Sequence, residues 1–253
     1  MKKLSIWMVV LLILWLVMTC AFLAIAPDRV PVHFGPSGEV DRWGSKYEYL
    51  LFMGIGAFVT VMPVLGNKFG FKKMWEGNEK LLPVVSISIS VFFLLLSGFF
   101  MWQALDPETL ANGLDQLAMK SVVILLMVLF IILGNLTPKA RRNSNFGLRI
   151  KWSKYNDTCW QKSQRISGFA MTLTGVVGLI LGILLPESWA MWVPLALVGV
   201  ALVVSIVGSY CVYRKEIDKQ KMLFFHPGRM AGIFPLFTIL FLEWVDFSAI
   251  IGL

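Results

Sequence analysis

The stretch WMVVLLILWLVMTCAFLAIA, residues 7–26, contains no charged side chain. An α-helix of about 20 such residues crosses roughly 30 Å, the width of the hydrocarbon core of a bilayer. Comparable apolar runs give six candidate spans, at about 5–26, 50–66, 84–104, 119–135, 166–185 and 190–212. With 57% hydrophobic and 15% charged residues, the 253-residue chain has more apolar surface than a soluble core could bury. The sequence therefore predicts an all-α integral membrane protein with six transmembrane helices.

The distribution of basic residues predicts how these helices are oriented. Most Lys and Arg residues fall in segments that are cytoplasmic if the N-terminus is inside. Residues 105–119, on the opposite side, contain no Lys or Arg, and the next basic residue is Lys120. Positively charged loops are retained in the cytoplasm, so we expect a multi-pass protein with a cytoplasmic N-terminus. The net charge of +8 follows from this topology. The expected partner is therefore the lipid bilayer with its anionic headgroups, with no direct nucleic acid.

The end of the chain is open to three interpretations. Residues 230–242 are apolar but short, contain Pro235, and precede Glu243 and Asp246. Such a segment is compatible with a seventh span, a re-entrant segment or an interfacial helix.

Several classes of activity find no support in the sequence. The central parts of all six spans lack ionisable residues, which argues against an ion-coupled transporter. Small residues in the fifth span, such as Gly168, Gly175 and Gly182, favour close helix packing over a substrate path. No catalytic motif is present, and the three dispersed cysteines, Cys20, Cys159 and Cys211, predict neither a disulfide nor a zinc site. We expect no enzyme activity, no cofactor and no metal.

The first outer loop, residues 27–49, has the pattern of a short β-hairpin. Alternating apolar residues flank a turn at Gly35-Pro36-Ser37-Gly38. A loop of that length would pair Phe34 with Glu39, His33 with Val40 and Val32 with Asp41. In this register His33 and Asp41 point to opposite faces of the hairpin, so a metal site is not expected and His33 is interpreted as a hydrogen-bonded structural residue.

The cytoplasmic loop, residues 136–165, contains an unusually polar and tryptophan-rich stretch that continues to Gly168. Gly147 is expected to adopt a positive φ or to approach another backbone closely. Asn156 or Asp157 could cap a helix that runs directly into the fifth span. Two interpretations stay open: Trp152 and Trp160 lie at headgroup depth as membrane anchors, or the loop is a docking surface for a cytoplasmic protein.

The two loops together resemble the SdpI family of bacterial membrane proteins. The cytoplasmic loop fits the family signature at many fixed positions, namely Asn143, Phe146, Gly147, Leu148, Arg149, Trp152, Ser153, Asn156, Asp157, Trp160, Lys162, Ser163, Arg165 and Gly168. The outer loop resembles an N-terminal domain of unassigned function that often precedes this signature, through Pro31, His33, Phe34, Gly38, Asp41, Trp43, Gly44 and Lys46. The chain departs from the usual family pattern at Arg142 and Lys151, where Pro is common, and at Gln164, where His is common.

The resemblance implies a function in a bacterial cytoplasmic membrane. It implies immunity against a secreted, membrane-active toxic peptide, together with tethering of a cytoplasmic transcriptional repressor. The outer binding residues would be His33, Phe34, Asp41, Trp43 and Lys46, and the inner ones Asn143, Gly147, Arg149, Trp152, Trp160 and Arg165. The alternatives are a transporter or exporter of a small or peptide substrate, and a structural envelope-stress protein.

The expected organisation follows from these assignments. We divide the chain into a two-helix unit with the outer loop (1–66), a third helix with its flanking loops (67–118), an SdpI-like region (119–213) and a C-terminal tail (214–253).

Overall fold

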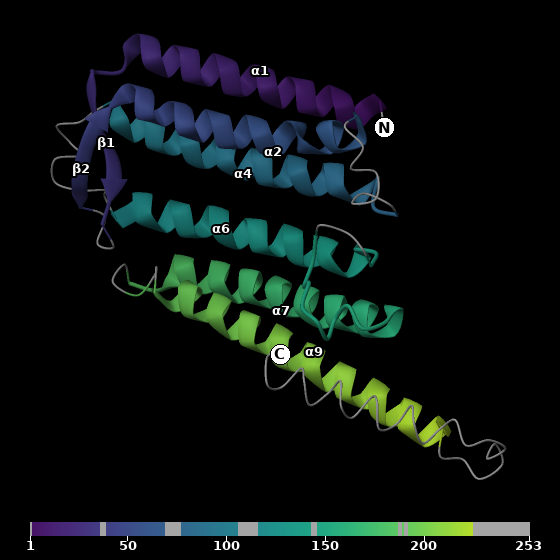
Figure 1. Cartoon of the computed structure of the whole chain (residues 1–253). Helices are drawn as coiled ribbons and strands as arrows, with labels where there is room; N and C mark the ends of the chain where they lie inside the picture. The colour runs from purple at the N-terminus through teal and green to yellow at the C-terminus, as the bar shows by residue number, and fades with distance from the viewer. Residues whose placement is uncertain are drawn as a thin grey trace, which may run out of the picture.

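The computed structural model describes residues 2–35, 39–68, 77–105, 116–142, 146–186, 189 and 192–224. Six helices lie side by side in these ranges: α1 (Lys2–Ile25), α2 (Leu50–Lys68), α4 (Leu81–Ala104), α6 (Gln116–Leu136), α7 (Asp157–Leu184) and α9 (Trp192–Phe224) (Figure 1). Five of the described helices are long and apolar enough to cross a membrane, and α2 runs beside them. The predicted all-α membrane fold is confirmed. The segment 230–242 lies outside the described residues.

The bundle consists of two groups of helices. In the first group α1, α2 and α4 contact one another, and in the second α7 packs against both α6 and α9. The contact between α4 and α6 joins the groups, so the helices follow one another across the bundle in chain order (Figure 1).

Helices α6 and α7 approach closely because glycines lie between them. A Cβ atom on Gly168 would lie 2.6 Å from the carbonyl oxygen of Gly134, and one on Gly175 would lie 2.8 Å from that of Met127. Both distances are too short for a real Cβ atom, so any larger residue would push the helices apart. The interpretation of these small residues as packing residues is confirmed.

Hydrogen bonds between buried side chains connect the first group of helices. The indole N–H of Trp15 on α1 donates to the Ser90 hydroxyl on α4 at 3.3 Å, and Ser90 lies 2.5 Å from the Thr60 hydroxyl on α2. The Thr60 hydroxyl also bonds the carbonyl oxygen of Gly56 in its own helix. Such bonds let polar residues lie among apolar helices without an unsatisfied group.

A two-stranded antiparallel hairpin covers one end of the first group (Figure 1). It consists of β1 (Arg29–Phe34) and β2 (Val40–Ser45), and the short 3-10 helix η1 (Lys46–Tyr49) leads from it into α2. The predicted hairpin is confirmed, but the predicted register is wrong, because Phe34 pairs with Val40 and His33 with Arg42. The pairing leaves one extra residue on each strand, at Val32 and at Asp41, so two irregularities offset each other.

The opposite end of the bundle carries the polar loop, which we define as residues 146–156. The 3-10 helix η2 (Thr137–Lys139) follows α6, and the polar loop then precedes α7. Helix α9 is the longest of the described helices, with 33 residues, and it extends past the start of α7 at this end (Figure 1). The hairpin and the polar loop are therefore separated by the length of the bundle.

Candidate functional site

The hairpin rests on a buried foundation at the end of the bundle. Val30 is fully buried, and the Tyr49 hydroxyl donates to the Pro31 carbonyl oxygen at 2.8 Å. Their apolar surroundings come from the ends of α1 and α4, namely Phe22, Ala26, Met101 and Ala104. Burial raises the pKa of the Tyr49 phenol, because the charged phenolate would lose its hydration there. The foundation therefore fixes the hairpin against both helices.

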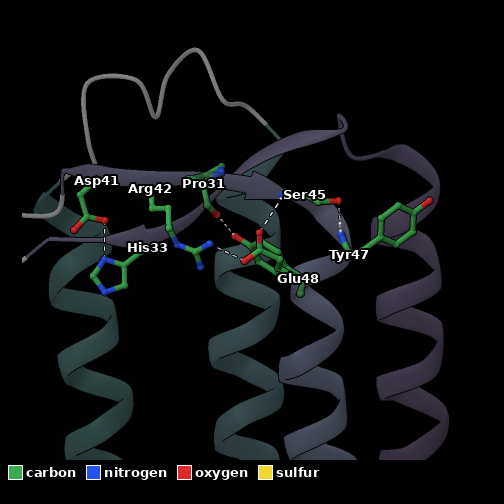
Figure 2. Close-up of polar contacts among 8 residues, drawn as sticks. Pro31, His33, Asp41, Arg42, Ser45, Tyr47 and Glu48 are labelled. Carbon is green, nitrogen blue, oxygen red and sulfur yellow. Dashed lines mark hydrogen bonds and ion pairs between the residues drawn. The ribbon is translucent and has the colours of Figure 1, made fainter.

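The turn from β2 into η1 is held by a capping box. The Ser45 side chain accepts from the Tyr47 N–H, while the Glu48 carboxylate accepts from the Ser45 N–H at 3.2 Å (Figure 2). Glu48 also forms an ion pair with Arg42 at 2.9 Å. A Cβ atom on Gly44 would lie 2.9 Å from both Cδ of Glu48 and Cγ2 of Val32, so any larger residue would displace these side chains where Glu48 folds back.

The outer surface of the hairpin carries a His–Asp pair. The Nδ1 atom of His33 lies 2.6 Å from Oδ1 of Asp41, and the two side chains are 64% and 45% exposed (Figure 2). The prediction that they point to opposite faces is wrong, because the extra residue at Asp41 brings its carboxylate to the side of His33. The expectation of a hydrogen-bonded His33 is confirmed. Among the described residues no group of three metal-ligating side chains occurs.

The other three predicted outer residues are less accessible. The ring of Phe34 stacks on Phe100 of α4 with centroids 5.4 Å apart, and Trp43 is half-buried. Lys46 is only 14% exposed, where its ammonium donates to the Ala26 carbonyl oxygen at 3.1 Å and pairs with Asp28 at 3.2 Å. These contacts fix the hairpin on the bundle, and His33 and Asp41 are the predicted residues that face outward.

The polar loop is held from within by the side chain of Gln164. Its Oε1 accepts from the Leu148 N–H at 2.8 Å, and its Nε2 donates to the Leu148 carbonyl oxygen at 2.9 Å. Gln164 is fully buried on α7. Gly147 has a φ of 107°, as predicted, and its α-carbon faces the Gln164 amide so closely that a Cβ atom would lie 3.0 Å from Cδ. The neutral Gln164 amide thus satisfies both backbone polar groups of Leu148, as a neighbouring β-strand would.

Two further residues complete the loop. The buried Ser153 hydroxyl lies 2.8 Å from the Leu148 carbonyl oxygen and accepts from the Ile150 N–H at 3.1 Å. Asn156 is the N-cap of α7 and accepts from the Cys159 N–H at 2.7 Å, which confirms the predicted cap. The chain can therefore turn directly from the loop into a membrane helix.

The loop also packs against the extension of α9. The ring of Trp152 meets that of Tyr210 edge to face, with centroids 5.0 Å apart. Tyr155 meets Tyr213 in the same way at 5.1 Å, and its hydroxyl donates to Gln220 at 2.9 Å. Helices α7 and α9 thus hold the loop from two sides.

The predicted inner residues occupy different environments. Arg149 is exposed, Trp152 is half-buried, and Arg165 is exposed on α7, while Asn143 lies outside the described residues. Trp160 is 1% exposed, and its indole N–H donates to the Ala140 carbonyl oxygen at 2.6 Å. It therefore faces protein, and the interpretation of Trp160 as a headgroup anchor is wrong.

The residues that build the loop are hard to identify from the sequence. Gln164 was visible only as a departure from the family pattern, and Ser153 only as part of a signature. Asn78, just before α4, holds the backbone of Arg141 through its buried amide, and no local pattern marked it. All three bond backbone atoms, which every residue type provides, so their partners leave no mark in the sequence.

These features define a multi-pass membrane protein with a structured element at each end of its bundle, and known families match both ends. The SdpI/YfhL protein family matches residues 139–209, which include the polar loop, α7 and much of α9. A domain of unknown function, DUF1648, matches residues 9–57, which include the hairpin. The chain is therefore similar to the SdpI/YfhL family in the part that carries the polar loop.

One curated relative carries a functional name. The chain is 30% identical over 88 residues to "Immunity protein SdpI" of Bacillus subtilis (strain 168), a match that covers 35% of this chain and 42% of the relative. The aligned part thus spans less than half of that protein. No solved structure matches the chain.

Proposed function

We propose that this chain protects a bacterial cytoplasmic membrane against a secreted, membrane-active toxic peptide. The similarity to an immunity protein carries the proposal. In the proposed orientation the N-terminus is cytoplasmic, the hairpin faces outward and the polar loop faces the cytoplasm, as the basic residues around the loop favour.

The hairpin is the proposed contact for the peptide. Its surface presents the paired side chains of His33 and Asp41 above a foundation that is fixed on α1 and α4. A rigid support lowers the entropic cost of binding, since little of the protein needs to be ordered by the ligand. A cationic or hydroxyl-bearing peptide segment would find an acceptor in Asp41.

The polar loop is the proposed docking surface for a cytoplasmic regulator. Arg149 and Trp152 present charged and aromatic surface, and such side chains recur at the centre of protein interfaces. Trp160 contributes by holding the chain that precedes the loop, through its bond to Ala140. The division of the chain into a hairpin unit and an SdpI-like region is part of the same proposal.

Signalling between the two ends requires a coupling free energy. The polar loop must have two arrangements, and the peptide must bind more tightly to the protein in one of them. A peptide that bound both equally well would not change their populations. The contact between α4 and α6 joins the two groups of helices and is the proposed route.

Survival of a toxin-sensitive bacterium tests the immunity function. Cells that express the chain are challenged with a panel of secreted membrane-active peptides while the abundance of the protein in the membrane is measured. We expect the wild type to protect the cells. The double variant His33→Ala/Asp41→Ala should tolerate about tenfold less peptide, because it removes two polar contacts to the peptide. Tyr47→Ala is the matched control, because Tyr47 is 61% exposed beside the same hairpin.

The outcomes separate the functional classes. Absence of protection against every peptide at confirmed abundance would contradict the immunity function. A transporter would instead show substrate-dependent flux in vesicles.

A second assay addresses docking. Arg149→Ala and Trp152→Ala are expected to retain normal abundance but to lose capture of the regulator from cytoplasm. Variants that lose abundance in parallel with every phenotype would favour a merely structural loop.

A further inference from the structure

A basic groove lies beside the start of α7, outside the polar loop. It has a volume of about 800 Å³ and is formed by residues 138–142, which follow α6, together with the first turns of α7. Four cationic side chains line it: Lys139, Arg141, Arg142 and Arg165. Among the described lining residues the only carboxylate is that of Asp157.

The wall of this groove is held in place by two buried side chains. The Asn78 amide donates to the Arg141 carbonyl oxygen at 3.2 Å and accepts from the Arg141 N–H at 2.9 Å. On the other side Trp160 donates to the carbonyl oxygen of Ala140. Asn78 and Trp160 are 2% and 1% exposed. The segment that carries three of the cations is thus fixed before any ligand binds, which lowers the cost of binding.

The charges in the groove are only partly balanced. Asp157 pairs with Arg142 at 3.3 Å. Glu79 does not line the groove, but its carboxylate is close enough to Arg141 for the two charges to interact. Its pKa is lowered by hydrogen bonds from the backbone N–H groups of Glu79 and Gly77 and by the charge of Arg141. Even with Glu79 counted, there are two carboxylates for four cations, and the first N–H groups of α7 add positive potential. The groove therefore favours an anion.

The position of the groove identifies the kind of anion. The stretch of α6 and η2 that is long and apolar enough to span a membrane ends at Lys139, and the corresponding stretch of α7 begins at Asp157, so one end of each lies in the wall of the groove. Charged residues at the ends of apolar helices lie at the depth of lipid headgroups, and basic pockets between such helices bind anionic headgroups. We propose that the groove holds the phosphate of an anionic glycerophospholipid headgroup.

Lipid binding by the purified full-length chain tests this proposal. The protein is titrated in maltoside micelles with dioleoylphosphatidylglycerol or dioleoylphosphatidylcholine, and bound lipid is counted by native mass spectrometry. We expect phosphatidylglycerol to bind first. Lys139→Gln/Arg165→Gln should weaken its binding about tenfold, because it removes two charge-assisted contacts to phosphate.

Two further variants separate the groove from general surface charge. Lys215→Gln/Lys219→Gln removes the same charge from exposed positions of α9 and should bind phosphatidylglycerol as the wild type does. Asp157→Asn removes the carboxylate that pairs with Arg142 and should bind several times more tightly, a gain that a misfolded variant would not show.

Three results would overturn the proposal. Equal losses in the groove pair and the α9 pair would mean that binding depends on diffuse charge. Displacement of phosphatidylglycerol by about 10 mM inorganic phosphate would identify a free anion as the ligand. Displacement by polyglutamate would identify an acidic protein segment instead.

Discussion

The polar side-chain contacts of the hairpin surface and of the polar loop lie in different environments. On the surface of the hairpin, His33 pairs with Asp41 and Arg42 with Glu48, through side chains that are 42–64% exposed. The polar loop depends on Gln164 and Ser153, which are neutral and fully buried. Exposed ion pairs contribute about 0–1 kcal/mol and are screened by salt, whereas a buried polar group that loses its partner costs about 1–3 kcal/mol. The loop should therefore hold its shape under conditions that loosen the hairpin surface.

The largest effect is expected from Gln164→Leu. It leaves the N–H of Leu148 without its partner and removes one of the two donors to the Leu148 carbonyl oxygen, the other being Ser153, and we expect the free energy of unfolding to fall by about 3 kcal/mol. Denaturant unfolding in micelles measures the change. Gln164→His, the residue usual in the family it resembles, should recover part of the loss. Wild-type stability in Gln164→Leu would remove the contrast between the two regions.

Gly147→Ala should have the next largest effect. The φ of 107° is unfavourable for any residue with a Cβ atom, and that atom would press on Gln164, so we expect a loss of about 1–3 kcal/mol. Gly199→Ala is the matched control, because a Cβ atom there meets nothing within 4 Å. Equal unfolding midpoints for the two variants would show that the loop tolerates a different backbone.

Tyr49→Phe tests the foundation of the hairpin. Loss of the bond to Pro31 should cost about 1 kcal/mol. Burial raises the pKa of the Tyr49 phenol above its ordinary value of about 10, so the protonated phenol stabilises the fold below that pH. This contribution should fall as the pH rises above about 10 and the unfolded chain ionises first. Hydrogen exchange of the hairpin amides should show that decline, and Tyr49→Phe should abolish it.

The smallest effect is expected from His33→Gln. The pair with Asp41 is exposed on both sides, so its removal should cost less than about 1 kcal/mol. The exposed ion pair of Arg42 and Glu48 should lose a similar amount in the wild type when about 1 M salt screens it. A loss as large as that of Gln164→Leu would show that exposure is a poor guide to how these regions are held.

The helices could be predicted because their signal is local. Hydrocarbon requires a continuous apolar stretch for each span, and Asn156 caps α7 through a residue three positions away. The hairpin register was not predictable in this way. The shift depends on Asp41 and Val32 as extra residues, in a hairpin whose Pro31 is bonded by Tyr49 at a separation of 18 residues.

The candidate site was less accessible to sequence reasoning than the fold. A tryptophan beside basic residues has the same composition whether it faces headgroups or protein, and only the fold shows Trp160 to be buried. Gln164 acts on a backbone 16 residues earlier, so nothing near it indicates its role. The exposed residues Arg149 and Arg165 are both candidates from the sequence. Only the fold shows that Arg149 lies in the polar loop and Arg165 lines the basic groove.

Helix α9 also gives the polar loop a mechanical connection to the bilayer. With 33 residues it measures about 50 Å, well beyond the roughly 30 Å of hydrocarbon. Its far part carries Gln220, which binds Tyr155 of the loop. Bilayer thickness sets the tilt of a long span, and a change of about 10° displaces the end of such a rod by roughly 4 Å. A peptide that thins the membrane would therefore move the end of α9 that contacts the polar loop, without touching the protein.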